Sequence, residues 1–462
     1  MDYFARRKIA PILAEPQATE NVIVMGWVRT RRDSTNLSFL EINDGSTLHN
    51  LQIVVENPDR FPELEKIKSG AAVRLVGNLI PVPQRKHKIE LHPEEISLVG
   101  DCPADYPLQK KRHSFEYLRE IAHLRPRTNT FGAVNRFRSK IAYAIHKFYQ
   151  ERGFYYMHSP IITATDAEGA GEQFWVTTFD LDKIPKIDGR VDYDKDFFAS
   201  QTFLTVSGQL EAEIMSLALG DVYTFGPIFR AEKSNTPRHV SEFWMIEPEM
   251  AFCDLDENMR LAGEFLMYLF EYALNECSEE MEFFSRWIEK NRITTLETLL
   301  KSKFEIVTYT EAVEILKKAK MKFEFPVNWG VTLQAEHERY LCEQHFNAPV
   351  MVKDYPKDIK AFYMRVNDDD KTVAAVDVLV PQIGEIIGGS QREERLDVLK
   401  KQVELFGVKE ESLWWYYDLR KYGSAPHSGF GLGFARLLMY MSGMANIRDV
   451  IPLPRTPRSA KF

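Results

Sequence analysis

Short apolar stretches separated by turn residues dominate the first hundred residues. Five stretches with strand character lie between about 21 and 98, and a short helical stretch over 61–70 separates the third from the fourth. This alternation predicts a five-stranded OB-fold β-barrel, a fold whose surface commonly presents aromatic and basic side chains to single-stranded nucleic acid. We expect this domain to cover residues 1–104 and a basic, proline-punctuated hinge to follow over 105–128.

The rest of the chain, 129–462, mixes helical and strand-like patterns, so we expect an α+β protein. Apolar residues at helical spacing predict a long amphipathic helix over 131–153 and a shorter one over 209–219. The run 154–163 is strand-like but contains Pro160. Because proline cannot donate a ladder hydrogen bond, this strand should lie at an edge or an interface.

The stretch 225–252 reads as an extended hairpin, with two apolar arms joined by a polar loop over 233–241. Strand alternation predicts that Arg230 and Glu232 share one face of the first arm. The ordinary alternative is that these charges form the solvated face of a ribbon. We expect that alternative for Glu249 on the second arm.

The composition of the chain excludes few classes of function. The net charge is -8, so nucleic-acid contacts must come from local basic patches, such as Arg31 and Arg32 beside Phe39. A solubilising loop and a core phenylalanine are the alternative there. The four cysteines show no CxxC or metal-ligand spacing, and no apolar run reaches membrane-spanning length. We expect no signal peptide, because the first residues lack a long apolar stretch. A cytoplasmic protein with reduced thiols is expected.

Several residues carry candidate chemistry. Asp377 and Glu385 lie near predicted strand ends and suit Mg²⁺, which prefers oxygen ligands. Glu168 lies in a glycine-rich loop, where it could meet a cation or simply face solvent, and Arg436 follows a glycine-rich strand that does not match a dinucleotide-binding pattern. The residues suggest no nucleophile with an adjacent base, so positioning and charge stabilisation are favoured, as in nucleotide-dependent ligation.

Three segments resemble the motifs of class II aminoacyl-tRNA synthetases. GFYYMHSPIIT resembles motif 1 (about 131–162), FRAE with EFW resembles motif 2 (about 225–252), and GFGLGFARL resembles motif 3 (about 427–455). The barrel resembles the anticodon-binding domain of the aspartate, asparagine and lysine subgroup. Within that subgroup, NTPRHVSEFWMIEPEM and GEIIGGSQREER resemble the asparaginyl-tRNA synthetases. The resemblance implies a catalytic domain over 129–462, built on a central antiparallel sheet flanked by helices.

The resemblance also implies site residues, with Arg230 and Arg436 as the catalytic pair. ATP would be bound by Arg230, Glu232, His239, Phe243, Glu385 and Arg436. The amino acid would be bound by Glu168, Ser207, Gln209, Arg230, Glu247 and Arg392. Mg²⁺ would be held by Asp377 and Glu385, and the anticodon by Arg31, Arg32, Phe39 and Gln52. The implied substrates are L-asparagine, ATP and tRNA(Asn), and the implied assembly is a homodimer through motif 1.

One position bears on the choice of amino acid. Aspartyl enzymes read SPQLFK where this chain reads SGQLEA, so Ala212 replaces a lysine that would pair with the aspartate carboxylate. Losing that cation favours a neutral amide, because a carboxylate without a partner in a dry site costs several kcal/mol. The alternatives left open are an aspartyl-tRNA synthetase with relaxed tRNA choice, a non-aminoacylating amide ligase relative, or an RNA-binding module that has lost catalysis.

Overall fold

The computed structural model describes residues 3–85, 87–165, 173–233, 236–408 and 410–462. The chain forms two compact units, Met1–Ala133 and Val134–Phe462, which we describe separately. The first is mainly β and the second combines helices with a large sheet, so the α+β prediction is confirmed. The predicted domain boundaries at 104 and 128 stay predictions.

The first unit contains the predicted five-stranded barrel, which is closed and has the strand order β1-β2-β3-β5-β4. Its strands are β1 (Thr19–Asp33), β2 (Leu37–Asn43), β3 (Leu51–Glu56), β4 (Ala72–Pro81) and β5 (Ile89–Gly100). Inward-facing aliphatic side chains such as Val24, Leu40 and Ile53 are at most 1% exposed and form its core. Helix α1 (Ile9–Ala14) precedes the barrel, and the predicted helical stretch between β3 and β4 consists of 3-10 turns over Pro58–Arg60 and Pro62–Lys66. After the barrel come α2 (Phe115–Glu120) and a 3-10 turn over Arg125–Arg127.

The second unit is built on an eight-stranded sheet with the order β14-β15-β16-β17-β18-β13-β12-β6. Its strands are β6 (Tyr155–Met157), β12 (Asp221–Phe229), β13 (Glu242–Ala251), β14 (Glu305–Thr308), β15 (Val350–Pro356), β16 (Thr372–Val380), β17 (Gly384–Gln391) and β18 (His427–Gly433). All neighbours in the middle of the sheet are antiparallel, which confirms the prediction. Only the two edge pairs, β14 with β15 and β12 with β6, are parallel.

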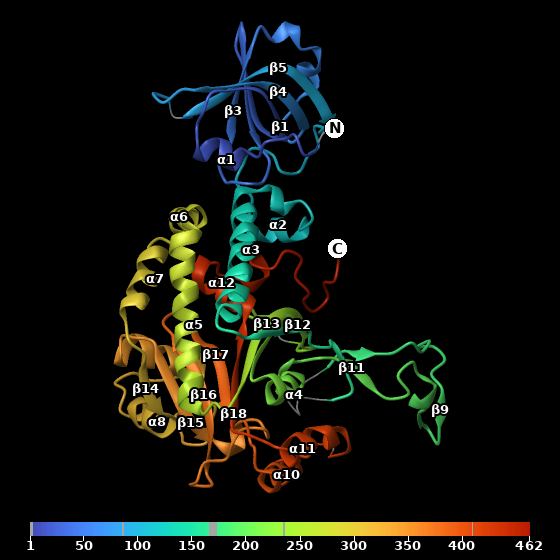
Figure 1. The fold of residues 1–462 in the computed structure, drawn as a ribbon, viewed down its shortest axis with the longest axis vertical. Helices are drawn as coiled ribbons and strands as arrows, with labels where there is room; N and C mark the ends of the chain where they lie inside the picture. Colours follow the sequence, from blue (N-terminus) through green and yellow to red (C-terminus); the bar gives the residue numbers. More distant parts are fainter. Residues whose placement is uncertain (1–2, 86, 166–172, 234–235, 409) are drawn as a thin grey trace. The chain divides into compact units, whose positions relative to one another are not determined.

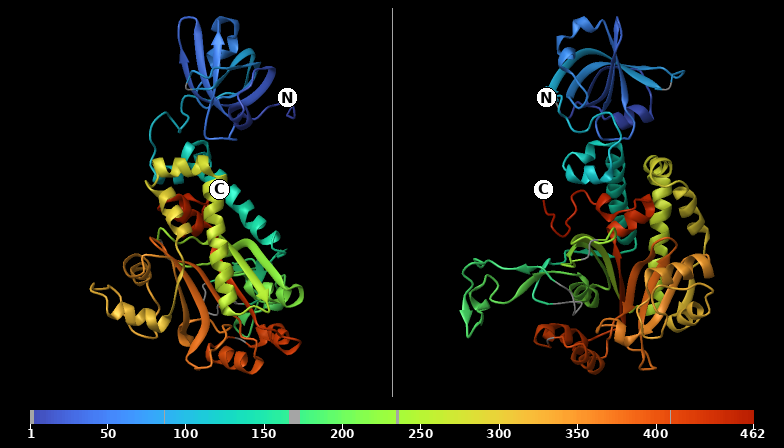
Figure 2. Two further views of the ribbon diagram at one scale, coloured as in Figure 1. Left: turned by 60° about the vertical axis from the view of Figure 1, so that its left-hand side comes forward. Right: turned by 180° about the vertical axis from the view of Figure 1, so that it is seen from behind.

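Helices cover this sheet (Figures 1 and 2). The long helix predicted over 131–153 is α3 (Asn129–Gln150), and it packs on α5 (Leu255–Glu276) through Phe148 and Phe265, whose ring centroids are 4.9 Å apart. Helix α5 crosses β16, β17 and β18. Helix α4 (Gln209–Leu219) matches its predicted bounds and contacts β12 and β13. The remaining helices are α6 (Ser278–Trp287), α7 (Arg292–Lys301), α8 (Tyr309–Lys317), α9 (Ala335–Tyr340), α10 (Leu396–Leu405), α11 (Trp414–Lys421) and α12 (Phe434–Ser442).

The strand predicted around Pro160 is divided between two sheets. Strand β6 forms one edge of the large sheet, whereas β7 (Ile162–Thr163) pairs in a small sheet with β11 (Thr202–Leu204), next to β8 (Trp175–Val176). Pro160 lies between β6 and β7, where it cannot donate a ladder bond. The edge position is confirmed, but the single continuous strand was wrong.

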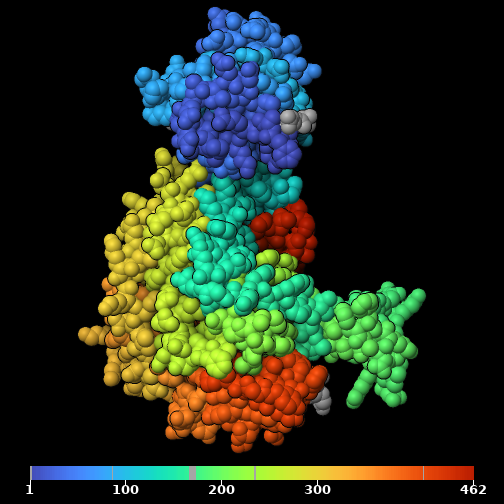
Figure 3. All heavy atoms as spheres, viewed as in Figure 1, coloured from blue at the N-terminus to red at the C-terminus, as the bar shows by residue number. Residues whose placement is uncertain are grey.

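An arm extends from the small sheet of the second unit. It carries the two-stranded ribbon of β9 (Lys186–Ile187) and β10 (Arg190–Val191) and stands out from the rest of that unit in the space-filling view (Figure 3).

The predicted hairpin is β12 and β13, paired in continuous antiparallel register from Asp221 with Met250 to Phe229 with Glu242. Strand β12 ends at Phe229, so Arg230 and Glu232 lie in the loop that follows it. Their predicted placement on one strand face was therefore wrong. Among the described residues, no helix is long and apolar enough to cross a membrane. All four cysteines are free and buried.

Candidate active site

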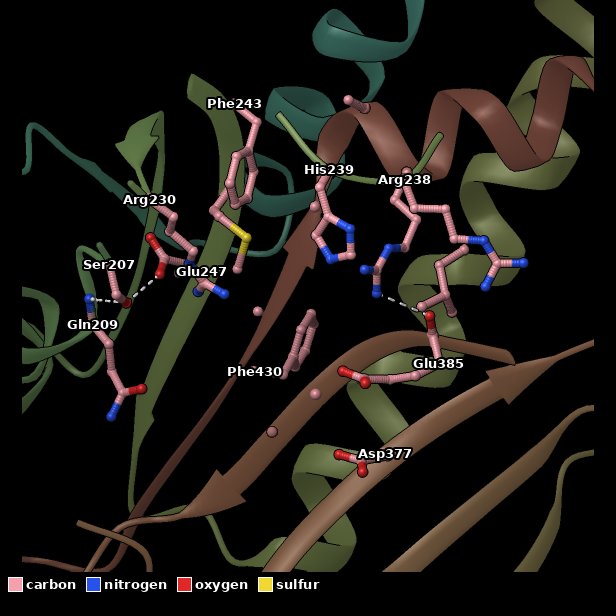
Figure 4. A pocket seen from close by; sticks show the side chains of 18 of the residues that line it. Ser207, Gln209, Arg230, Arg238, His239, Phe243, Glu247, Asp377, Glu385 and Phe430 are labelled. Carbon is pink, nitrogen blue, oxygen red and sulfur yellow. Dashed lines mark hydrogen bonds between the residues drawn. The ribbon is translucent and has the colours of Figure 1, made fainter. Parts of the chain in front are cut away.

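A cavity of about 350 Å³ opens above the face of β13 that carries Phe243, Met245, Glu247 and Glu249 (Figure 4). These residues share a face because side chains two positions apart in a strand point the same way. Helix α12, the loops after β12, and strands β16 and β17 supply the other walls. Residues of both motif 2 and motif 3 thus line the cavity.

One end of the cavity holds a carboxylate fixed in place by hydrogen bonds. Ser207 donates to Glu247 through its hydroxyl at 2.5 Å, the backbone N–H of Gly208 donates at 3.1 Å, and the hydroxyl of Thr224 donates at 3.0 Å. Gln209, the first residue of α4, also lines this end. Three donors leave the Glu247 carboxylate ordered and able to accept from an ammonium group.

Cationic side chains gather at the opposite end. Arg436 donates to the carbonyl oxygen of Glu385 at 3.3 Å, and Arg238 donates to that of Ile383 at 3.3 Å. Burial lowers the pKa of Arg238, and the neighbouring Arg436 lowers it further. Neighbouring guanidinium groups that repel one another attract a polyanion, because its negative charge relieves the repulsion.

The other predicted nucleotide residues lie elsewhere around the cavity: Arg230 lies beside Glu247, and His239 lies between them and Arg238 (Figure 4). The Arg230 guanidinium carbon lies 5.6 Å from the centre of the Phe243 ring. His239 is bonded through Nδ1 to the hydroxyl of Thr236 at 2.5 Å, and its Nε2 lies 4.0 Å from a carboxylate oxygen of Glu232. A flat aromatic face with a guanidinium above it is suited to stacking a planar ring.

Two carboxylates converge over a glycine on the sheet. A Cβ atom added at Gly388 would lie 3.1 Å from Glu385 Oε1 and 3.6 Å from Asp377 Oδ1. Burial, and then the nearby Asp377, raise the pKa of Glu385, and the charges of Lys360, Arg436 and Arg230 offset this only in part. Oxygen ligands that face a common open space fit a hard divalent cation. Lys360 pairs with the outer carboxylate, and its ammonium lies 2.9 and 2.8 Å from the two oxygens of Asp377.

A third carboxylate supports this pair from helix α9. Glu338 accepts a hydrogen bond from the backbone N–H of Glu385 at 3.0 Å. Burial raises the pKa of Glu338 to about 7. Glu338 lies in the stretch 292–355, for which the sequence alone predicted no chemistry.

The floor of the cavity carries a buried ion pair. Arg392 donates from Nε to a Glu249 oxygen at 3.1 Å and from a terminal nitrogen to the other oxygen, and it also donates to the hydroxyl of Ser390 at 2.7 Å. Both partners of the pair are at most 2% exposed. Burial alone would lower the pKa of Arg392, but the Glu249 carboxylate raises it. The expectation of a solvated Glu249 was therefore wrong, because strand alternation places this residue on the cavity side of β13.

Eleven of the predicted site residues line this single cavity: Ser207, Gln209, Arg230, Glu232, His239, Phe243, Glu247, Asp377, Glu385, Arg392 and Arg436. Glu168 lies outside the described residues. Fifteen further residues line the cavity without having been predicted as site residues, among them Arg238, Met245, Lys360 and Gly388. Met245 could have been predicted, because it shares a strand face with Phe243 and Glu247. No pattern in the sequence around Lys360 indicated that it would line the cavity.

Comparison with known proteins decides the family. The family "tRNA synthetases class II (D, K and N)" matches residues 115–457, and the family "OB-fold nucleic acid binding domain" matches residues 22–99. An asparagine–tRNA ligase of Synechocystis is 57% identical over 99% of this chain and 100% of its own length. One from Acetivibrio thermocellus is 59% identical over 96% of each chain. This chain belongs to the asparagine–tRNA ligase family of class II tRNA synthetases.

A solved structure agrees with this assignment. The asparaginyl-tRNA synthetase of Pyrococcus horikoshii, complexed with asparaginyl-adenylate, has a TM-score of 0.84 and 30% identity to this chain, with 99% of each chain covered. The match spans both units of this class II synthetase. The resemblance drawn from the three motifs is confirmed.

The predicted anticodon residues of this tRNA synthetase occupy different environments on the barrel. Arg32 is exposed and lies directly opposite half-buried Phe39 across β1 and β2. The guanidinium of Arg31 instead bonds within the barrel, to Asp33 at 2.9 Å and to the carbonyl of Ile67 at 3.1 Å. Gln52 is 9% exposed, and its amide nitrogen donates to the carbonyls of two core residues, Leu40 and Ile53. Arg32 and Phe39 are thus the better placed for an outside ligand.

Proposed function

We propose that the cavity joins L-asparagine to ATP and that the protein then transfers the asparaginyl group to tRNA(Asn). The substrate carboxylate attacks the α-phosphorus of ATP, the bond to the β-phosphate breaks, and pyrophosphate leaves. The terminal ribose hydroxyl of the tRNA then attacks the acyl carbon and releases AMP. No protein nucleophile is needed, since both steps depend on positioning and charge stabilisation.

The observation that carries this proposal is the buried pair of Arg392 and Glu249 in the floor of the cavity. Arg392 is the residue expected to meet the substrate side chain, and its guanidinium is already bonded by a carboxylate. An aspartate side chain would add a second negative charge there, whereas the asparagine amide can accept from Arg392 and donate to Glu249. Because an uncompensated buried carboxylate costs several kcal/mol, this floor favours the amide.

The two ends of the cavity fit the other parts of the substrates. Glu247 and Gln209 would receive the substrate ammonium group, and Arg230 would hold the α-phosphate and the substrate carboxylate. Phe243 would stack beneath the adenine, with Arg436 on the other face and reaching a terminal phosphate. Figure 4 shows Gln209 and Glu247 beside Arg230 on one side of the cavity and Arg238 on the other, and this arrangement supports the orientation.

Asp377 and Glu385 would hold Mg²⁺ over Gly388, where their oxygens converge. The ion would supply positive charge to the phosphates of ATP. The chain itself holds the backbone of Glu385 through its N–H bond to Glu338 and the carboxylate of Asp377 through the ion pair with Lys360.

For tRNA, Phe39 would stack on an anticodon base and Arg32 would contact the backbone. The predicted roles of Arg31 and Gln52 receive less support, because their nitrogen donors already bond within the barrel. A homodimer through motif 1 is supported by β6, an edge strand on which Tyr155 and Tyr156 are 60% and 48% exposed. A cytoplasmic location is supported by the four free, buried cysteines.

The proposal is tested by ATP–pyrophosphate exchange with asparagine and with aspartate, followed by charging of purified tRNA(Asn) and tRNA(Asp). We expect exchange with asparagine and transfer to tRNA(Asn). Exchange with aspartate alone would overturn it in favour of an aspartyl enzyme. Exchange without transfer to any tRNA would favour a non-aminoacylating ligase, although relatives of 57% identity over the full length make both alternatives less favoured.

A further inference from the structure

Another buried carboxylate, Glu213 of helix α4, is not among the residues that line the cavity. It is 0% exposed and accepts hydrogen bonds from four side chains. The donors are Gln209 at 3.1 Å, Tyr416 at 2.8 and 3.0 Å, Arg420 at 2.6 Å and His427 through Nε2 at 3.0 Å. We call these five residues the Glu213 cluster. It ties α4 to α11 and to the first residue of β18.

The cluster reaches the cavity through Gln209. The amide nitrogen of Gln209 donates to Glu213 Oε1, and an ionised carboxylate can only accept. Burial would raise the pKa of Glu213, but Arg420 and His427 lower it, so the carboxylate is ionised. The amide of Gln209 therefore has one orientation, in which its carbonyl oxygen is left to accept from a ligand.

The cluster also approaches the floor of the cavity. Glu213 Oε1 lies 4.0 Å from Nε of Arg392, the residue that is bonded to Glu249. At this distance and burial, the charge of Glu213 contributes to the field that a substrate side chain meets, because the surroundings screen it weakly. Replacing Glu213 by a neutral residue would make the floor one charge more positive.

We propose that Glu213 is a positioning residue for asparagine selection. It orients the Gln209 carbonyl oxygen toward the substrate ammonium group, and its negative charge keeps the floor unfavourable for an aspartate side chain. This inference rests on the proposed function. Glu213 itself does not line the cavity, and it acts through Gln209 and Arg392, which do.

The test is Glu213→Gln, assayed by ATP–pyrophosphate exchange in the full-length protein. Loss of the charge-assisted bond to Gln209 should raise the KM for asparagine by about tenfold or more while the KM for ATP stays near the wild-type value. The inhibition constant of aspartate should fall by about tenfold, since the floor gains one positive charge. Tyr416→Phe is the matched control: it removes one hydrogen bond to the same carboxylate but keeps its charge and its bond to Gln209, so both constants should stay near wild type.

A double-mutant cycle separates positioning from folding. In a Gln209→Ala background, Glu213→Gln should no longer raise the KM for asparagine, because the amide it orients is gone. If Glu213→Gln does not fold, Glu213→Asp provides the test, since it keeps the charge but shortens the reach to Gln209: it should raise the asparagine KM without strengthening aspartate inhibition. Unchanged constants in a folded variant with a lower melting temperature would overturn the proposal and leave Glu213 a structural anchor. Absence of asparagine exchange in the wild type would instead count against the proposed function.

Discussion

The ammonium group of Lys360 lies 2.9 and 2.8 Å from the two carboxylate oxygens of Asp377. Asp377 is one of the two carboxylates that converge over Gly388, where a divalent cation is proposed to bind. The same ammonium lies 3.9 Å from the centre of the Tyr355 ring. Lys360 therefore supplies positive charge to this site from within the chain, and a metal ion has to compete with it.

The first prediction concerns Lys360→Met. Without the competing ammonium, Mn²⁺ should bind the nucleotide-free protein more tightly by roughly tenfold, since a partly exposed ion pair of this kind is worth on the order of 1 kcal/mol. Electron paramagnetic resonance of free Mn²⁺ during titration measures this affinity without any reaction. Lys357→Met, which removes an ion pair with Asp370, is the control and should leave it unchanged. Weaker Mn²⁺ binding by Lys360→Met would mean that the lysine supports the site.

The second prediction concerns Arg436, which lines the cationic end of the cavity. Arg436→Ala should slow ATP–pyrophosphate exchange by about 10²–10³-fold, the usual cost of losing one preorganised charge donor. Binding of tRNA, measured by filter retention, should stay near wild type. Arg260→Ala on the exposed side of α5 is the matched control and should affect neither. Equal losses of exchange and tRNA binding by Arg436→Ala would indicate a folding defect instead.

The third prediction is a pH dependence of stability. Burial raises the pKa of Glu211, in the first turn of α4, from 4.5 to about 7, and the charges of Glu247 and Glu213 add to this. The folded state thus keeps a proton that the unfolded state releases, so this group lowers stability as the pH rises from 4.5 to about 7. The difference between the two pKa values corresponds to a loss of at most ~3 kcal/mol in the free energy of unfolding, at 1.36 kcal/mol per pKa unit.

Glu211→Gln should therefore raise the melting temperature by a few degrees at pH 8 and change it little at pH 4. Differential scanning fluorimetry at the two pH values measures the difference. Glu271→Gln, at an exposed position of α5, should show no such contrast. An equal effect of Glu211→Gln at both pH values would mean that the carboxyl does not titrate in this range.

The fourth prediction concerns the barrel. Phe39→Ala should weaken tRNA(Asn) binding by roughly 1–3 kcal/mol, the cost of losing one base-stacking platform, and leave pyrophosphate exchange unchanged. Phe4→Ala, at a phenylalanine that is 94% exposed in the same unit, is the matched control. Unchanged tRNA affinity would show that Phe39 only packs against the barrel.

Arg31 and Arg32 extend this test. Arg32→Ala should weaken tRNA binding and reduce its salt dependence, because it removes an exposed charge. Arg31→Ala should mainly destabilise the barrel, because its guanidinium bonds to Asp33 and to the carbonyl of Ile67. The reverse pattern would restore the predicted phosphate role of Arg31.

Part of the cavity could be predicted because its residues match positions of a known family, and some of the elements that carry them could be predicted from local patterns. The antiparallel pairing of β12 and β13 and the start of α4 at Gln209 follow from local apolar patterns and turn residues. The same patterns could not tell where β12 ends, so Arg230 and Glu232 were placed on a strand that stops at Phe229. Strand ends depend on the loop that follows, and this loop is fixed by distant contacts such as the bond from Arg238 to Ile383.

By itself, the sequence determined the five-stranded barrel and the antiparallel sheet, because alternation and helical spacing are local properties of the chain. Its resemblance to the class II synthetases implied eleven of the residues that line the cavity. Only the tertiary structure decided which charges are paired. Glu249 meets Arg392, and Glu213 meets Arg420, across 143 and 207 positions of sequence. Pairing of buried charges depends on which strands and helices become neighbours, and no local pattern records that. These long-range pairs decide which charged groups remain available to a substrate.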